Sequence, residues 1–180
     1  MRTCRPPEPA LLFIGTLYSD SSIFNSSKEL LKDCFGEILY ESLPVPWDYS
    51  FHYRNELGSP ISRQFIFFRN MLDSDTIADI KLKTIEIEDL LSLNGKRRIN
   101  LDPGYLTLAK IVLASTKNYS HRIHLKNGIY GEVTLIYHSK DGTFKPHLFT
   151  YRDYQDQTFI DLFLKIRSEL KNMEENMHSD

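Results

Sequence analysis

The stretch ALLFIGTL, residues 10–17, decides how the rest of the chain is arranged. Its Leu, Ile and Phe side chains fall on both faces of an extended backbone, a pattern typical of a strand that is buried on both sides. We therefore expect residues 10–17 to form the central strand of a sheet, with the other elements packed around it.

The segments that follow this strand carry helix and strand signals in turn. Apolar side chains recur at helical spacing between Asp20 and Gly36, two residues suited to capping, and predict a helix over residues 22–35. The elements expected next are a strand over 37–42, a strand over 61–69, a helix from Asp73 to a stop at Asn94-Gly95, and a strand over 97–101. This order matches the ferredoxin-like β-α-β-β-α-β fold.

Beyond this core the sequence predicts an extension. Residues 103–116 are apolar nearly all round, which predicts a buried helix. Asn127-Gly128 is a strong hairpin signal, and residues 155–176 carry the apolar stripe of a final helix. Two strands flank the hairpin turn and a third follows, over residues 120–125, 129–137 and 143–149. The predicted class is α+β: a ferredoxin-like core extended by a buried helix, a β-hairpin or meander, and a C-terminal helix.

Length and composition describe one domain. The chain has 180 residues, of which 41% are hydrophobic, and it shows no internal repeat and no polar linker. We therefore expect a single domain over residues 1–180, with a flexible tail at 1–9 and a frayed end at 174–180.

Charge and cysteine content limit the partners and the compartment. With 22 Lys and Arg against 24 Asp and Glu, the chain lacks the positive surplus of nucleic-acid-binding proteins. No apolar run approaches the roughly 20 residues that span a bilayer. Cys4 lies in a polar tail and Cys34 on a helix stripe, so we do not expect them to pair. These features predict a cytoplasmic protein that binds neither membrane nor nucleic acid. They do not indicate an oligomeric state.

Positive charge is nevertheless concentrated in one segment. Residues 96–145 carry nine Lys and Arg against three Asp and Glu, a surplus of six, in a chain whose formal net charge is −2. Two interpretations are open: the lysines keep turns soluble, or the segment holds a local anion site.

The run from Arg97 to Tyr105 contains the residues that could form this anion site. Strand alternation would place Arg98, Asn100 and Asp102 on one surface. The following Pro103 fits the first position of the predicted helix, with Asp102 as its N-cap. A helix N-terminus beside arginines suits a phosphate or a carboxylate, with Arg98, Asn100 and Tyr105 as ligand-binding residues. Because Asp102 would repel that anion, it could instead hold a divalent metal that bridges to it.

An aromatic loop is a second candidate. Residues 43–60 carry Trp47, Tyr49, Phe51 and Tyr53 at two-residue intervals. The loop could cover a ligand, with Trp47 among the binding residues, or it could be an arm that packs on the core.

The hairpin adds a histidine and an acid. A two-residue turn would place His121 and Glu132 diagonally on one face, with Arg122 and His124 on the other. The pair of His121 and Glu132 could bind a metal, orient a general base, or be a satisfied buried contact.

Several stretches together resemble one protein family. They are FIGTLYS at residues 13–19, RRINLDPGY at 97–105, HRI at 121–123, GIYGEVTL at 128–135 and YRDY at 151–154. The chain resembles a family of uncharacterised bacterial proteins catalogued as domain of unknown function 4416, over nearly its full length. This resemblance implies no activity, cofactor or catalytic residue.

Three functional hypotheses follow from the residues. The first is a domain that binds a small anionic ligand, such as a nucleotide or a phosphorylated metabolite. The second is a hydrolase that depends on Mg²⁺ or Mn²⁺, with Asp102, Glu132 and Asp153 as metal ligands and His121 as the base or a fourth ligand. In this hypothesis His121, Glu132 and Asp102 are the catalytic residues. The third is an interaction module without chemistry. They differ in whether these side chains converge on one concavity.

Overall fold

The fold is an antiparallel sheet with helices on both faces, in a computed structural model that describes residue 4 and residues 6–177. The predicted tail at 1–9 and frayed end at 174–180 therefore lie partly outside the described residues. The strands are β1 (Ala10–Tyr18), β2 (Ile38–Glu41), β3 (Val45–Trp47), β4 (Ile61–Leu72), β5 (Ile99–Leu106), β6 (Lys110–Ser115), β7 (Ile123–Lys126), β8 (Ile129–His138) and β9 (Thr143–Pro146). The α-helices are α1 (Ser21–Phe35), α2 (Phe51–Leu57), α3 (Ile77–Leu90) and α4 (Gln157–Met177), and two 3₁₀ turns span Ser74–Thr76 and Asp153–Gln155.

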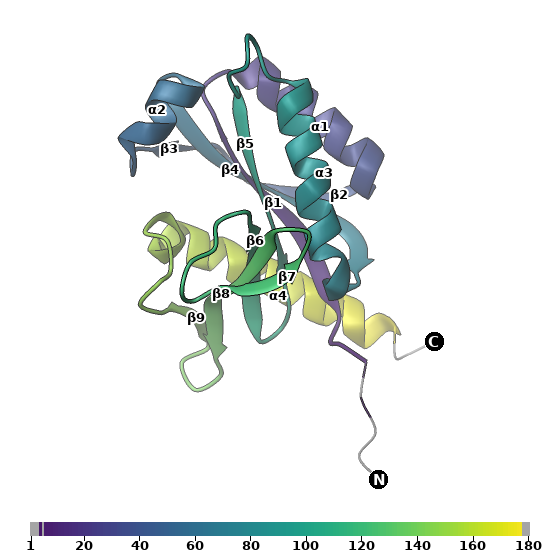
Figure 1. Cartoon of the computed structure of the whole chain (residues 1–180). Helices are drawn as coiled ribbons and strands as arrows, with labels where there is room; N and C mark the ends of the chain where they lie inside the picture. The colour runs from purple at the N-terminus through teal and green to yellow at the C-terminus, as the bar shows by residue number, and fades with distance from the viewer. Residues whose placement is uncertain (1–3, 5, 178–180) are drawn as a thin grey trace.

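The strand order confirms the predicted α+β class. The sheet runs β2-β4-β1-β5-β6-β8-β7, while β3 pairs with β4 and β9 with β8 (Figure 1). Its first four strands, with α1 and α3 as connections, have the order of a ferredoxin-like core. Since β1 pairs with β4 on one side and β5 on the other, the stretch at residues 10–17 is the centre of that core.

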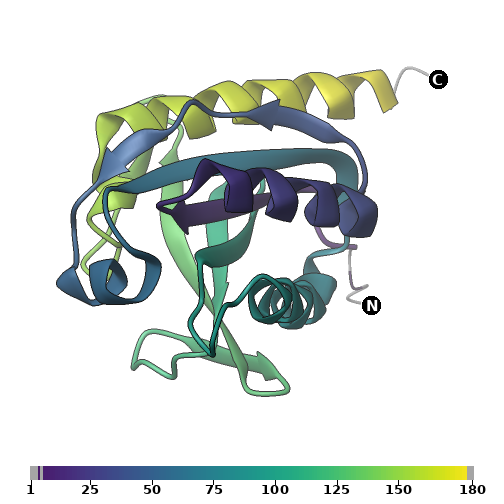
Figure 2. The same cartoon turned by 90° about the horizontal axis from the view of Figure 1, so that it is seen from above.

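Helices cover both faces of this sheet. The α1 and α3 helices pack on one face and α4 crosses the other (Figure 2). Leu12 and Ile14 of β1 belong to the core under α1 and α3, whereas Leu11 and Phe13 belong to the core under α4. Alternate side chains of β1 therefore pack into two different cores, which explains why the stretch is apolar at nearly every position.

The predicted buried helix at residues 103–116 is wrong. That segment is the end of β5, a turn, and β6. An apolar run alone cannot distinguish a buried helix from strands that are covered on both faces. Pro103 lies where β5 has only β1 as a neighbour, since pairing with β6 begins at Gly104. At Gly104 a Cβ would lie 2.5 Å from the backbone oxygen of Val112, so the residue marks a close approach of two strands.

The aromatic loop at residues 43–60 has more structure than the sequence predicts. It contains β3 and α2, and it forms a third small core in which Trp47 packs with Leu17, Leu57 and Ile61. The loop is therefore an arm with its own core, and Trp47 is only 8% exposed.

The hairpin forms at Asn127-Gly128 with a register shift. His124 pairs with Tyr130 and Lys126 with Ile129, so the strands are irregular at Leu125. The third strand, β9, is shorter than predicted and ends at Pro146.

Candidate functional site

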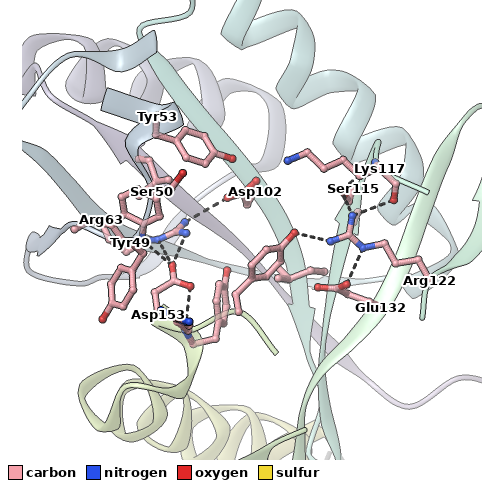
Figure 3. A pocket seen from close by; sticks show the side chains of 17 residues that line it. Tyr49, Ser50, Tyr53, Arg63, Asp102, Ser115, Lys117, Arg122, Glu132 and Asp153 are labelled. Carbon is pink, nitrogen blue, oxygen red and sulfur yellow. Dashed lines mark hydrogen bonds and ion pairs between the residues drawn. The ribbon is translucent and has the colours of Figure 1, made fainter. Parts of the chain in front are cut away.

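A cavity of about 280 Å³ lies on the α4 side of the sheet, beyond the N-terminal end of that helix. Strands β1, β4, β5, β6 and β8 contribute to its lining, as do the aromatic loop and the segment from Tyr151 to Tyr154 (Figure 3). Its size is close to the lower end of the range for small-molecule sites, roughly 300–1,000 Å³.

The sheet register explains why this part of the face is polar. Gly15 on β1 lies between Phe65 on β4 and Asp102 on β5. Two residues further on, Leu17 lies between Arg63 and Asn100. Side chains directly opposite one another share a face, so the charged groups begin where the phenylalanine core ends.

Gly15 leaves the space that this polar group occupies. A Cβ built there would be 3.1 Å from Nη1 of Arg63, from Cε1 of Phe65 and from the hydroxyl oxygen of Tyr154. The phenol of Tyr154 and the guanidinium of Arg63 therefore meet over the bare backbone of β1.

A buried ion pair forms one wall. The Arg63 guanidinium donates to Oδ2 of Asp153 from Nε at 3.0 Å and from Nη2 at 2.6 Å, and both side chains are about 5% exposed. Nε1 of Trp47 donates to the same oxygen at 3.1 Å. Burial of a charged pair is tolerated when hydrogen bonds satisfy it in this way.

Asp102 connects this wall to a polar chain along β5. Its Oδ2 accepts from Nδ2 of Asn100 at 2.8 Å and from Nη1 of Arg63 at 3.4 Å. Asn100 in turn accepts from Arg97, whose guanidinium pairs with Glu56 at 2.7 Å. The carboxylate of Asp102 is 31% exposed and faces the cavity from β5 (Figure 3).

A second buried arginine forms the opposite wall. Nε of Arg122 donates to Oε2 of Glu132 at 2.7 Å, and Nη2 donates to the Tyr151 hydroxyl at 2.5 Å. Nε2 of His121 lies 2.6 Å from the same Oε2. The His121 ring stacks on Phe149 with ring centroids 4.4 Å apart. Figure 3 shows Arg122 and Glu132 across the cavity from Arg63 and Asp153.

Two buried polar atoms that line or border the cavity lack a partner among the described residues. They are the hydroxyl of Tyr154, a side chain that is 1% exposed, and Oε1 of Glu132. Burial raises the pKa of Tyr154 well above its ordinary value, and it also raises the pKa of Tyr53 and Tyr151. All three phenols therefore keep their protons at neutral pH and can donate hydrogen bonds.

The rim carries positive charge. Lys117 and Arg152 are exposed, and neither forms an ion pair within residues 6–177. Together with Arg63 and Arg122 they give the lining four basic residues against three acidic ones, Asp102, Glu132 and Asp153. The cavity thus has fixed, neutralised arginines inside and unpaired cations at its opening.

The structure brings most of the predicted site residues together. Trp47, Asp102, Glu132 and Asp153 all line the cavity. Asn100 lies one hydrogen bond behind Asp102, and His121 one contact behind Glu132.

Two predicted ligand-binding residues lie elsewhere. Arg98 pairs with Asp20 at 2.9 Å in a separate depression, because it precedes β5 and is not held to the strand alternation. Tyr105 is three residues from Asp102, so it points to the other face and packs on the core under α1 and α3. The helix N-terminus expected at Asp102 and Pro103 is wrong, because both residues lie in β5. Arg122 also lies on the Glu132 side, contrary to expectation, since β7 begins only at Ile123.

Sequence reasoning missed Arg63, Arg122, Lys117 and Tyr154 as site residues. Arg63 had a usable signal, because a charged residue inside a strand with the pattern ISRQFIFF must find a buried partner. Tyr154 had none, since its role depends on the space above Gly15.

The three acids proposed as metal ligands do not form a ligand cluster. Oxygens of Asp153, Glu132 and Asp102 each accept from an arginine. Within the described part of the chain, no group of three or more His, Cys, Asp or Glu side chains is placed to hold a metal ion.

A family model described as Domain of unknown function (DUF4416) matches residues 8–170. No curated protein and no solved structure matches the chain. Among the described residues, no helix has the length and apolar character needed to cross a membrane. The family description records no chemistry, so a function has to be argued from the cavity.

Proposed function

We propose that this chain, which belongs to the DUF4416 family, binds a small anionic ligand of the phosphate or nucleotide type in the cavity between Arg63 and Arg122. The cavity shares Asp102 with the strand-to-helix junction that the sequence suggested, whereas Arg98 and Tyr105 of that junction lie elsewhere. The ligand is a small molecule, because the site is a compact cavity and not an extended basic surface.

The distribution of donors supports an anion. Lys117 and Arg152 offer unpaired charges at the rim, and the phenols of Tyr53, Tyr151 and Tyr154 remain protonated donors. A phosphate oxygen accepts several hydrogen bonds at once, so it can use donors that approach from different strands. The aromatic faces of the loop offer a surface on which a ring could stack.

The single observation that carries the proposal is the Tyr154 hydroxyl. It is buried, it belongs to a residue that lines the cavity, and it has no partner among the described residues. Leaving such a group unsatisfied costs about 1–3 kcal/mol. A ligand oxygen within reach would recover that cost, which gives the protein a reason to keep a hydroxyl where phenylalanine would be more stable.

The experiment compares Tyr154→Phe with the wild type. Binding of inorganic phosphate, pyrophosphate and adenosine 5′-monophosphate is measured by isothermal titration calorimetry and by thermal shift. We expect at least one probe to bind the wild type. Its affinity for Tyr154→Phe should fall by roughly 10-fold or more, the value of a hydrogen bond to a charged group. The free energy of unfolding of the empty protein should be unchanged or raised.

The matched control is Tyr137→Phe, a half-buried tyrosine that packs under α4 away from the cavity. It should leave ligand affinity unchanged. The proposal is overturned if none of the three probes binds, or if Tyr154→Phe binds as tightly as the wild type.

The proposal includes a cytoplasmic location. Cys4 and Cys34 are both free and exposed, which suits a reducing compartment. We do not propose the hydrolase, because His121 stands behind Glu132 and does not line the cavity.

A further inference from the structure

Two carboxylates in the cavity are each satisfied at one oxygen only. Oε2 of Glu132 contacts both Arg122 and His121, whereas Oε1 is buried without a partner. Oδ2 of Asp102 accepts from both Asn100 and Arg63, whereas Oδ1 accepts no hydrogen bond from a described residue. In both cases one oxygen anchors the side chain and the other remains available.

The sheet places these two carboxylate side chains around the same cavity. Glu132 on β8 pairs with Leu113 on β6, which pairs in turn with Gly104 on β5. Asp102 is two residues from Gly104 and therefore shares its face. Glu132 and Asp102 thus face one cavity from strands on either side of β6, as Figure 3 shows.

An anion alone would leave these oxygens unsatisfied. Carboxylate oxygens only accept hydrogen bonds, so a fully deprotonated anion beside them would add repulsion and no bond. The ligand must therefore carry donors as well as negative charge.

Hydroxyl donors fit this site better than ammonium donors. Glu132 pairs with Arg122 at 2.7 Å, and Asp102 shares Arg63 with Asp153, which lies closer to that guanidinium. The available oxygens need a proton donor, and a hydroxyl supplies one as a neutral group. The unpaired Lys117 and Arg152 at the rim would also repel a positive group as it entered.

We infer that the ligand is a phosphorylated compound with free hydroxyl groups, the chemistry shared by sugar phosphates and ribonucleotides. The phosphate lies toward Lys117, Arg152 and the phenols, and the hydroxyls donate to Glu132 Oε1 and Asp102 Oδ1. This inference rests on the proposed function and names its ligand class.

The test uses two pairs of probes that differ only in hydroxyl groups. The first pair is ribose 5-phosphate and 2-deoxyribose 5-phosphate. The second is adenosine 5′-monophosphate and its 2′,3′-dideoxy analogue. Dissociation constants are measured by calorimetry on the full chain. We expect the hydroxylated member of one pair to bind at least 10-fold more tightly than its deoxy partner. The pair that shows this difference identifies the ligand class as a sugar phosphate or a nucleotide.

Two variants then assign the preference to the carboxylates. Glu132→Gln and Asp102→Asn should each reduce the hydroxyl preference severalfold, mainly by weakening the hydroxylated probe. Asp102→Asn is included because Asp102 is partly exposed and its loss disturbs the fold less than the loss of Glu132, which pairs with buried Arg122. The control is Glu169→Gln on the exposed side of α4, which should keep the full preference.

The possible failures are distinguishable. Equal binding of the hydroxylated and deoxy probes overturns the inference and leaves the anion site standing. An unchanged preference in a folded Asp102→Asn and a folded Glu132→Gln also overturns it. Absence of binding by every phosphate probe overturns the proposed function together with the inference.

Discussion

One face of the sheet has two ends that differ in what they leave unsatisfied. Under α4, Phe13, Phe67 and Phe163 are fully buried and contact one another at centroid distances of 5.2–5.8 Å. Four residues along β4 from Phe67, Arg63 is also buried, and so is Tyr154 in the 3₁₀ turn beside it, yet the Tyr154 hydroxyl has no partner among the described residues. The phenylalanine end contributes packing alone. The polar end retains a hydrogen-bonding group that the folded chain leaves without a partner among the described residues.

The packed end and the polar end of this face lie directly beside each other. The boundary between the two ends is the row of Phe65, Gly15 and Asp102, where an aromatic ring, a bare backbone and an acid lie side by side. A shift of one residue in the register of β4 or β5 would carry Arg63 or Asp102 to the other face of the sheet. The antiparallel pairing of β1 with both neighbours is therefore what positions the site.

The largest expected effect is loss of the buried arginine. Arg63→Ala leaves Asp153 buried without its cation, and we expect the free energy of unfolding to fall by about 3–5 kcal/mol. Arg98→Ala, which breaks the more exposed pair with Asp20, should cost less than about 1 kcal/mol. Urea denaturation of the two variants measures the difference. Equal losses would mean that the polar end contributes no more to stability than a surface pair.

A smaller effect is expected where the two ends meet. Gly15→Ala places a methyl group 3.1 Å from Arg63 and Tyr154, and such overpacking typically costs about 1–3 kcal/mol. The substitution should also weaken binding, because it displaces both pocket side chains. Gly131→Ala is the matched control on β8, since its nearest contact is a flexible leucine end at 3.3 Å. Thermal unfolding of both variants checks the prediction, and a Gly15→Ala protein as stable as Gly131→Ala would contradict it.

A third difference concerns the pH dependence of stability, which Tyr154 at the polar end should alter at alkaline pH. The folded-state pKa of Tyr154 is raised by burial above the unfolded value of about 10. Its contribution to stability is therefore fully present below about pH 10 and is lost as the pH rises from there toward the folded pKa. In that range the wild type should lose stability faster than Tyr154→Phe, by up to about 1.4 kcal/mol per pH unit. Denaturation curves at several alkaline pH values measure the two slopes, and parallel slopes would refute the assignment.

The sequence predicts the packed phenylalanine end of the sheet well and the polar end only in part. The two-sided apolar pattern of residues 10–17 and the Asn127-Gly128 turn are local signals, and both elements form, although the hairpin pairs His124 with Tyr130 where a regular turn would pair Leu125. Residues 103–116 mislead because strands covered on both faces look like a buried helix. Asp102 and Glu132 could be found from strand alternation, although Arg98 and Tyr105 could not be excluded without the start of β5 and its true length. Arg63 meets Asp153 across 90 residues, a distance that no local pattern spans.

The smallest effect on stability is expected at the rim, where it should coincide with a clear loss of binding. Lys117 is exposed and forms no ion pair in the described part of the chain, so Lys117→Ala should change the free energy of unfolding by less than about 0.5 kcal/mol. Its affinity for adenosine 5′-monophosphate should nevertheless fall severalfold, and the deficit should shrink at high salt because a solvent-exposed charge is screened. Lys140→Ala, an exposed lysine in the turn after β8, is the control and should affect neither quantity. Calorimetry at low and high salt distinguishes the two variants. If Lys117→Ala binds like Lys140→Ala at low salt, the positive rim does not contribute to anion capture, and binding depends on the buried donors alone.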